Sequence, residues 1–259
     1  MYETGLLILG ITAGILSGLF GIGGGIVMVP TLIAFFGMNI LDANATSLAA
    51  MLLPVGMWGV WAYYKAGYLN IKESLWISLG LFVGSFFGGE IAINISEKLL
   101  AHLYAAILLY VALSYFDLRS LFGLKKKKER ELNEKDLKPK PVWAFVLVGL
   151  AAGIFAGLFG KGGGLVIVPL LIAIFHYDPK KAAATSLAAL QLPVGLPSVL
   201  IYAGEGHLSV LFAALIAVGI VIGVFFGSKI GVKLPSSIFK KVYAFFLLAV
   251  AIYMVSKYI

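Results

Sequence analysis

Two runs of glycine within apolar sequence are the positions in this chain best suited to binding a ligand. The motif GLFGIGGG occupies residues 18–25, and GLFGKGGG occupies residues 157–164. Three successive glycines cost a helix about 1 kcal/mol each relative to alanine, so we expect each helix to break there. Bare backbone lets a ligand approach closely. The N–H groups and the dipole of the half-helix that follows each break, near Gly25 and Gly164, would then attract an anion.

Hydroxyl side chains occur at equivalent places after each glycine motif. Thr46 and Ser47 follow the first motif, and Thr185 and Ser186 follow the second. Their hydroxyl groups can donate hydrogen bonds to an oxyanion without requiring a counter-charge. Serine and threonine also commonly hydrogen-bond neighbouring helices within membranes, so both roles stay open for these four residues.

Two polar residues at or after the second glycine motif have apolar counterparts 139 residues earlier, at or after the first motif. Gln191 corresponds to Leu52, and we expect Gln191 to line a cavity because contact with lipid would be unfavourable for its amide. Lys161 stands where the first copy has Ile22, and it either contacts the ligand or extends its amine to the surface. The predicted substrate-binding residues are Gly23, Gly24, Gly25, Thr46, Ser47, Lys161, Gly162, Gly163, Gly164, Thr185, Ser186 and Gln191.

Most other site chemistry is excluded by residue types and spacing. The chain has no cysteine, which rules out thiolate catalysis and disulfides. Its histidines, His102, His176 and His207, are far apart and match no metal-ligand motif. GIGGGI lacks the third glycine of a dinucleotide fingerprint, and a glycine follows Lys161 where a P-loop needs serine or threonine. We therefore predict no metal, no cofactor and no enzymatic activity.

The composition places this chain in a lipid bilayer. Of its 259 residues 61% are hydrophobic and only 12% charged, and the mean hydropathy is +1.01. Apolar segments of about 20 residues recur, the length a helix needs to cross about 30 Å of hydrocarbon. The net charge of +8 is concentrated in residues 125–140 and in short loops. That distribution fits positive-inside topology better than nucleic-acid binding.

The chain contains an internal repeat in which roughly half of the residues from Gly14 to Gly89 reappear 139 positions later. Gly18 corresponds to Gly157 and Pro30 to Pro169, and the match continues without insertion. This regularity predicts a duplication. We divide the chain into a first membrane repeat (1–123), a charged linker (124–141) and a second membrane repeat (142–259).

Each repeat is predicted to be entirely helical. A glycine-broken stretch (4–36 or 143–176) precedes three plain transmembrane helices. These spans are expected near 43–64, 74–94 and 98–121, and near 181–203, 208–229 and 237–258. Glycines at every fourth residue, such as Gly10, Gly14 and Gly80, Gly84, are typical of close helix packing. Asp178 before Pro179 is a good helix start.

Two topologies are open for the glycine-broken stretches. If they cross the membrane, the halves are parallel and many lysines of the second half lie outside. If each is a re-entrant hairpin, the second half is inverted, and Lys65, Lys72, Lys180 and Lys181 all lie inside with the linker. The positive-inside bias favours the inverted arrangement. Inverted repeats with broken helices are a recurrent design of transporters.

With two halves that each carry G-x-[FL]-G-x-G-G-G, then V-P, A-T-S and a proline, the chain resembles the TauE/SafE sulfite exporter family. The resemblance covers nearly the whole sequence. It implies a permease for sulfite or related organosulfur anions that acts without ATP hydrolysis, with Gly21 to Gly25 and Gly160 to Gly164 as its signature. The related thiosulfate uptake proteins use intramembrane cysteines, and this chain has none.

The sequence thus predicts a secondary transporter of a small anion, sulfite or an organosulfur compound, in the plasma membrane. Its linker would be cytoplasmic, a proton or sodium gradient could drive it, and it could form a homo-oligomer. Two other functions are compatible with the same residues. One is a passive anion channel, and the other is a non-catalytic membrane subunit of a sulfur-metabolising system.

Overall fold

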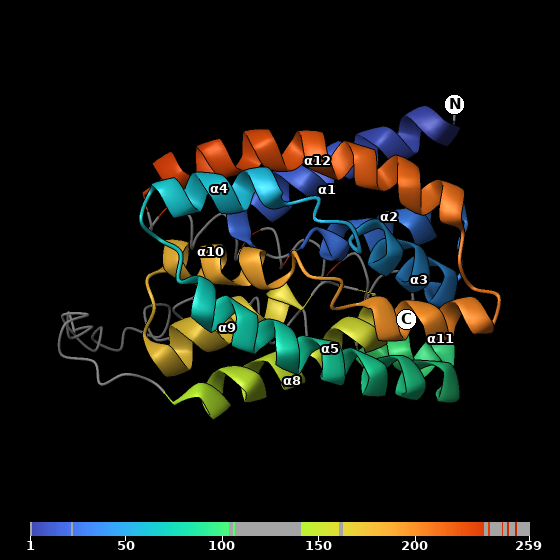
Figure 1. The fold of residues 1–259 in the computed structure, drawn as a ribbon. Coiled ribbons are helices and arrows are strands. Elements are labelled where there is room, and N and C mark those ends of the chain that lie inside the picture. The colour runs from blue at the N-terminus through green and yellow to red at the C-terminus, as the bar shows by residue number, and fades with distance from the viewer. Residues whose placement is uncertain are drawn as a thin grey trace, which may run out of the picture.

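The computed structural model describes residues 2–21, 23–103, 141–160 and 163–235, together with the single positions 106, 238, 245, 248 and 252. All the regular secondary structure of these residues is helical (Figure 1). The main helices of the first half are α1 (Tyr2–Phe20), α2 (Gly25–Phe36), α3 (Ile40–Ala50), α4 (Met57–Lys65) and α5 (Ile71–Asn94). Those of the second half are α8 (Val142–Phe159), α9 (Gly164–Phe175), α10 (Pro179–Ala189), α11 (Leu196–Gly204) and α12 (Val210–Lys233).

Two pairs of long helices form opposite sides of the molecule. The helices α1 and α12 lie along one side and α5 and α8 along the other, with shorter helices between them (Figure 1). Among the described residues these four helices are long and apolar enough to cross a membrane. Their outer faces carry many exposed aromatic and aliphatic side chains, as lipid contact requires.

Glycines allow the backbones within each pair to touch. Gly10 faces Gly219 and Gly14 faces Gly223 between α1 and α12, and a Cβ atom at Gly14 would lie 2.5 Å from the carbonyl oxygen of Ile220. Such contact is sterically impossible, so only glycine fits. Equivalent glycines, among them Gly84, join α5 to α8. The expectation that the four-residue glycine spacing serves helix packing is confirmed.

Both glycine motifs interrupt a helix, as predicted. After α1, Gly21, Gly23 and Gly24 have φ values of 67°, 78° and 73°, in the left-handed region that glycine tolerates. After α8, Gly160 and Gly163 have φ values of 64° and 63°. A new helix starts directly after each interruption, at the first residue of α2 or α9.

The spans predicted at 43–64 and 181–203 are wrong as continuous helices. Each is two short helices separated by a six-residue break, at 51–56 between α3 and α4 and at 190–195 between α10 and α11. Pro54 supplies no N–H, and the turn around it bonds the amide of Met57 to the carbonyl of Pro54 over 3.1 Å. The spans at 98–121 and 237–258 lie mostly outside the described residues.

The element bounds follow the sequence repeat. Shifting α2, α3, α4 and α5 by 139 residues reproduces the bounds of α9, α10, α11 and α12 residue for residue. The predicted start of α10 is also correct, because the side chain of Asp178 accepts a hydrogen bond of 2.9 Å from the amide of Lys180.

Charged residues divide between two ends of the molecule. At one end the Nζ atom of Lys180 donates to the carbonyl of Val232 over 2.8 Å, which joins the start of α10 to the end of α12. At the other end Asp42, at the start of α3, contacts His207 in the loop before α12. The end that contains Lys180 is called the lysine end, and it carries Lys65, Lys72, Lys180, Lys181, Lys229, Lys233, Glu73 and Asp178. The end that contains Asp42 is called the acidic end, and it carries Glu3, Asp42, Glu90, Glu97, Glu205 and Lys98.

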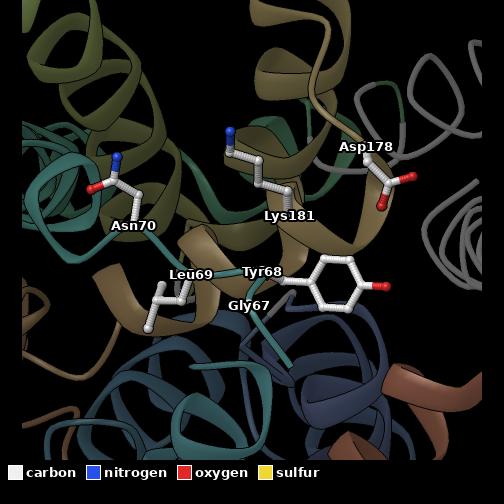
Figure 2. A pocket seen from close by; sticks show the side chains of 6 residues that line it. All are labelled: Gly67, Tyr68, Leu69, Asn70, Asp178 and Lys181. Carbon is white, nitrogen blue, oxygen red and sulfur yellow. The ribbon is translucent and has the colours of Figure 1, made fainter. Parts of the chain in front are cut away.

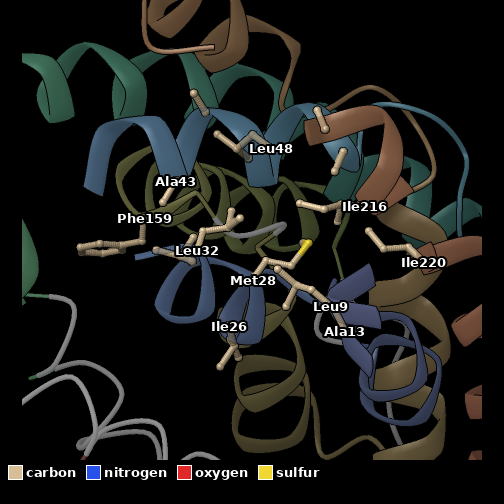
Figure 3. Packing of buried hydrophobic residues seen from close by; sticks show 14 of the residues in the cluster. Leu9, Ala13, Ile26, Met28, Leu32, Ala43, Leu48, Phe159, Ile216 and Ile220 are labelled. Atoms are coloured by element: carbon tan, nitrogen blue, oxygen red, sulfur yellow. The ribbon is translucent and has the colours of Figure 1, made fainter. Parts of the chain in front are cut away.

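The largest buried apolar cluster lies where short helices, among them α2 and α3, meet the pair formed by α1 and α12. Met28 and Leu32 of α2 are fully buried beside Ala13 of α1 and Ile216 of α12 (Figure 3). Phe159, the last residue of α8, belongs to the same cluster. This packing holds the two glycine breaks inside protein rather than against lipid.

Candidate functional site

The first glycine break rests on a helix of the second half. A Cβ atom at Gly21 would lie 2.7 Å from the Cα atom of Ala183, so the break touches the backbone of α10. The hydroxyl of Ser186, also on α10, donates to the carbonyl of Gly21 over 2.6 Å. Ser186 therefore makes an interhelical hydrogen bond, the second of the two roles open to it from sequence.

The second glycine break rests in the same way on a helix of the first half. A Cβ atom at Gly160 would lie 2.7 Å from the Cβ atom of Asn44 on α3. The Nδ2 atom of Asn44 donates to the carbonyl of Leu158 over 2.9 Å. Each half thus contacts the glycine break of the other half. The contact is made by α3 or α10, the helices that carry the Thr-Ser pairs.

Two buried tyrosines fix the ends of the helices that precede the breaks. The hydroxyl of Tyr63 lies 3.1 Å from the carbonyl of Gly18 and 3.0 Å from that of Leu19, at the end of α1. The hydroxyl of Tyr202 donates to the carbonyl of Gly157 over 2.7 Å, at the end of α8. The last carbonyls of a helix have no partner within it, so these buried hydroxyls satisfy them inside the protein.

A small cavity lies beside the first break. Its volume is about 20 Å³, and its walls include Ser17, Gly23, Met51, Gly56, Gln191 and Ile220. A space of this size holds about one water molecule. Sulfite, with four heavy atoms, needs more room, so the surrounding helices must move apart before such an ion can occupy the place.

Gln191 connects the two halves at this cavity. Its Oε1 atom accepts a hydrogen bond of 2.9 Å from the amide of Gly56, and its Nε2 atom donates to the carbonyl of Leu187 over 2.7 Å. A Cβ atom at Gly56 would lie 2.5 Å from Nε2, so a larger residue at this position would displace the amide of Gln191. The side chain lines a cavity, as its sequence position predicts, while substrate binding by Gln191 stays a prediction.

Four polar atoms near the breaks are buried and have no hydrogen-bond partner within the described part of the chain. They are Oδ1 of Asn44, Oγ1 of Thr46, Oγ of Ser47 and Oγ1 of Thr185. All four residues are 0% exposed. Leaving such a group unpaired costs about 1–3 kcal/mol. A ligand or an ordered water molecule that reached these atoms would remove that cost.

Comparison with known proteins decides the family. The model of the sulfite exporter TauE/SafE family matches residues 6–254. The chain belongs to the TauE/SafE family. It is 31% identical over 250 residues to a protein of Methanocaldococcus jannaschii, covering 91% of this chain and 87% of that one. A Haemophilus influenzae protein is 31% identical over 275 residues, covering 97% of both chains.

A third relative, from Bacillus subtilis, is 28% identical over 227 residues, covering 88% of this TauE/SafE chain and 89% of its own. All three relatives bear the name "Probable membrane transporter protein". No solved structure matches the chain. The family and these relatives identify the chain as a membrane transporter protein.

The signature glycines of this TauE/SafE protein occupy the helix starts. Gly24 is the N-cap of α2 and Gly163 that of α9, and no described side chain caps either start. Gly25 and Gly164 are the first helical residues. Of the other predicted site residues, Lys161 and Gly162 lie outside the described part of the chain.

Sequence reasoning missed Ser17, Asn44 and Gly56 as site residues. A signal was available for two of them, because Ser17 corresponds to Ala156 and Asn44 to Ala183 in the repeat. Both are polar in one copy and apolar in the other, as is Gln191. Within the described ranges no group of three histidine, aspartate or glutamate side chains could hold a metal.

Proposed function

We propose that this protein is a secondary transporter that carries a small anion, sulfite or an organosulfur anion, across the plasma membrane. The observation that carries the proposal is the reciprocal seating of the two breaks. Gly21 rests on α10 and Gly160 rests on α3, so two half-helix starts lie inside the molecule. N–H groups at such starts, together with the helix dipole, favour an anion.

The directions of the long helices support an inverted repeat. Because Gly10 lies opposite Gly219 and Gly14 opposite Gly223, α1 runs parallel to α12. The helix α8 runs parallel to α5 in the same way. Since α12 starts at the acidic end and α5 at the lysine end, α1 and its repeat equivalent α8 start at opposite ends.

Aromatic contacts support re-entrant hairpins. The ring centroids of Tyr2 and Phe36 are 5.9 Å apart, which brings the end of α2 back to the start of α1. The rings of Phe145 and Phe175 stack at 4.9 Å, which does the same for α9 and α8. Each hairpin returns to the end where it began, and its glycine tip lies within the protein.

The separation of charge supports a cytoplasmic lysine end. Six of the seven described lysines lie at that end, and five of the seven described acids lie at the other. Cytoplasmic segments of membrane proteins carry an excess of lysine and arginine. In this orientation α8 starts from the cytoplasm, so the charged linker 124–141 that precedes it is cytoplasmic, and a small anion meets positive potential there.

The buried hydroxyls supply further anion contacts. Thr46 and Thr185 are repeat equivalents whose hydroxyls have no partner among the described residues. Neutral donors bind an oxyanion without holding it too tightly for release. The proposed substrate site comprises these hydroxyls, Ser47, Gln191 and the N–H groups after each glycine run, and opens further than the cavity of about 20 Å³ when substrate is bound.

Counterflow in liposomes tests the function. Purified protein is reconstituted with unlabelled sulfite inside, and uptake of radiolabelled sulfite is followed under anaerobic conditions. A carrier gives saturable, transient accumulation that internal sulfite stimulates. A passive channel gives no such overshoot, and a subunit without transport activity gives the rate of empty liposomes. Sulfate, thiosulfate and taurine as competitors define the anion class, and imposed proton or sodium gradients identify the coupling ion.

A further inference from the structure

A row of aromatic rings with a lysine at each end lies on the outer surface where α4 meets α12. The rings of Trp58 and Trp61 on α4 meet edge to face with centroids 6.4 Å apart, and Trp58 meets Phe225 of α12 in the same way at 6.2 Å. The Nζ atom of Lys65 lies 3.8 Å from the ring centroid of Trp61, and that of Lys229 lies 3.8 Å from the centroid of Phe225. We call these five residues the aromatic row.

The helix α4 places the aromatic row within one leaflet of the membrane. It packs along the last part of α12, with Gly59 against Val224 and Ser228 (Figure 1). Its nine residues extend about 13 Å at about 1.5 Å per residue, which is close to half of the ~30 Å of hydrocarbon in a bilayer. Because Lys65, the last residue of α4, is at the lysine end, the row lies in the leaflet on that side.

The aromatic row is exposed on the surface that faces lipid. Trp58 and Trp61 are about half exposed, and Lys65 and Lys229 are exposed as well. Contact with a ring engages one side of an ammonium group and leaves its other N–H groups able to donate. The described acids of the lysine end lie on α5 and before α10, and they form no ion pair with either lysine. The row therefore presents positive charge beside an apolar surface.

Two other lysines of the lysine end make contacts within the protein. The Nζ atom of Lys180 lies 5.4 Å from the ring centroid of Tyr68, which joins the second half to the first. The Nζ atom of Lys181 lies 4.4 Å from the ring centroid of Tyr177. Lys181 and Tyr68 line a surface pocket of about 310 Å³ between the loop after α4 and the start of α10 (Figure 2). These two lysines thus contribute to packing between helices and loops, whereas those of the aromatic row face outward.

The equivalent surface at the acidic end, where α11 meets α5, keeps one of the five residues and none of the charge. The equivalents of Trp58, Trp61, Lys65, Phe225 and Lys229 are Pro197, Leu200, Gly204, Phe86 and Glu90. The helices α11 and α5 still pack together, so packing alone does not require the aromatic row. A carboxylate in place of the second lysine would repel an anion. The difference between the two ends points to a ligand in one leaflet.

We propose that the aromatic row is a binding site for an anionic phospholipid of the leaflet at the lysine end. The two ammonium groups supply the positive charge for the headgroup phosphate, and the tryptophan rings lie against the lipid below it. Because the rings hold the amines in place beforehand, less conformational entropy is lost on binding. Basic sites between transmembrane helices are a recurrent form of lipid recognition. This site goes beyond the proposed transport function and does not depend on it.

Lipid titration of the purified full-length protein tests the site. Native mass spectrometry follows the binding of phosphatidylglycerol, with phosphatidylcholine as the neutral reference. We expect tighter binding of phosphatidylglycerol. Lys65→Gln and Lys229→Gln should each weaken it about fivefold, the usual contribution of one lysine near an anionic membrane surface, and leave phosphatidylcholine binding unchanged. Equal affinities for the two lipids in the native protein, or unchanged affinity in both variants, would overturn the proposal.

The matched charge control is Lys72→Gln. It removes an exposed lysine at the start of α5, at the same end of the molecule but outside the aromatic row. We expect little change in phosphatidylglycerol binding. A loss equal to that of Lys65→Gln would mean that the lipid responds to the charge of the whole end and that no site exists. Gel filtration verifies that each variant is folded.

Tryptophan variants separate a specific site from the general preference of tryptophan for membrane interfaces. Trp61→Leu removes the ring beneath Lys65 and should weaken phosphatidylglycerol binding about threefold, the usual scale of an exposed contact between a cation and a ring. Trp76→Leu, at an exposed tryptophan of α5 near the same end, should change it little. Equal effects of the two variants would assign the rings to interface anchoring and overturn the site.

Two further measurements examine other occupants of the aromatic row. Soluble glycerol 3-phosphate should not displace phosphatidylglycerol, and displacement at equal concentration would show that the site takes a free anion. A mass of two copies for the native protein and of one copy for Lys65→Gln would instead assign this surface to contact between protomers. None of these assays uses sulfite, so a failure of lipid binding and a failure of anion transport are distinguishable.

Discussion

The amide of Gly56 donates a hydrogen bond to the side chain of Gln191 across the boundary between the two halves, over 2.9 Å. The repeat equivalent of Gln191 is Leu52, which has no polar group to offer the equivalent glycine, Gly195. At that position a Cβ atom would instead lie 3.2 Å from a methyl group of Leu48. The two halves are thus joined by a hydrogen bond between Gly56 and Gln191 at one position, and by apolar contact between Gly195 and Leu48 at the equivalent position.

Gln191→Leu makes the two copies alike at this position and tests the bond. The change leaves the amide of Gly56 without a partner, which costs about 1–3 kcal/mol. We expect the melting temperature in detergent to fall by roughly 2–10 °C, since about 1 kcal/mol shifts a chain of this size by a few degrees. Leu192→Ala, at a neighbouring residue that is 45% exposed, is the control. A melting temperature equal to that of the control would contradict the structural role of the bond.

The sequence predicted the helical breaks at the glycine runs because glycine has a strong local effect on backbone conformation. Positive φ at Gly23 and Gly163 is accessible to glycine and costly for other residues. The breaks after α3 and α10 were missed, although Pro54 and Pro193 were visible. Proline in a transmembrane span often produces only a kink, and the sequence does not tell a kink from a six-residue interruption.

Gly84→Ala tests how closely α5 and α8 pack. A Cβ atom at Gly84 would press on the carbonyl oxygen of Leu150 and lie 2.9 Å from the amide of Ile154. Both neighbours are backbone and cannot move aside, so we expect a loss of folded protein on gel filtration. Gly204→Ala is the matched control, because no atom of the described residues lies within 4 Å of its Cβ position. Equal folded yields for the two variants would show that the helices are farther apart.

Ser186 and Ser47 are repeat equivalents with different surroundings, and this difference predicts different effects of alanine. Ser186→Ala removes the donor to the carbonyl of Gly21 and should lower the melting temperature by several degrees. Ser47→Ala removes a buried hydroxyl that has no partner among the described residues, and should leave the melting temperature unchanged or raise it. If Ser47 binds substrate, its variant alone loses the thermal stabilisation that sulfite gives to the native protein. Equal falls in melting temperature for Ser186→Ala and Ser47→Ala would contradict the predicted difference between the two sites.

The pairing of each break with the opposite half could not be predicted from sequence. The repeat shows that Asn44 and Ala183 are equivalent, yet it does not reveal that each touches the glycine of the other half's break. That contact arises from the way two copies assemble, and hydrophobic periodicity within one copy carries no information about it. Differences between the copies were the available signal, since Asn44 and Gln191 both replace an apolar equivalent.

The inverted arrangement predicts opposite membrane sides for equivalent loops. Ala66 and Glu205 are repeat equivalents, and both are exposed at the ends of short helices. We introduce each as a single cysteine, Ala66→Cys or Glu205→Cys, and label intact cells with an impermeant thiol reagent. Glu205→Cys should react from outside, and Ala66→Cys only after the membrane is permeabilised. Labelling of both from the same side would require parallel halves and would remove the opposed half-helix starts on which anion binding depends.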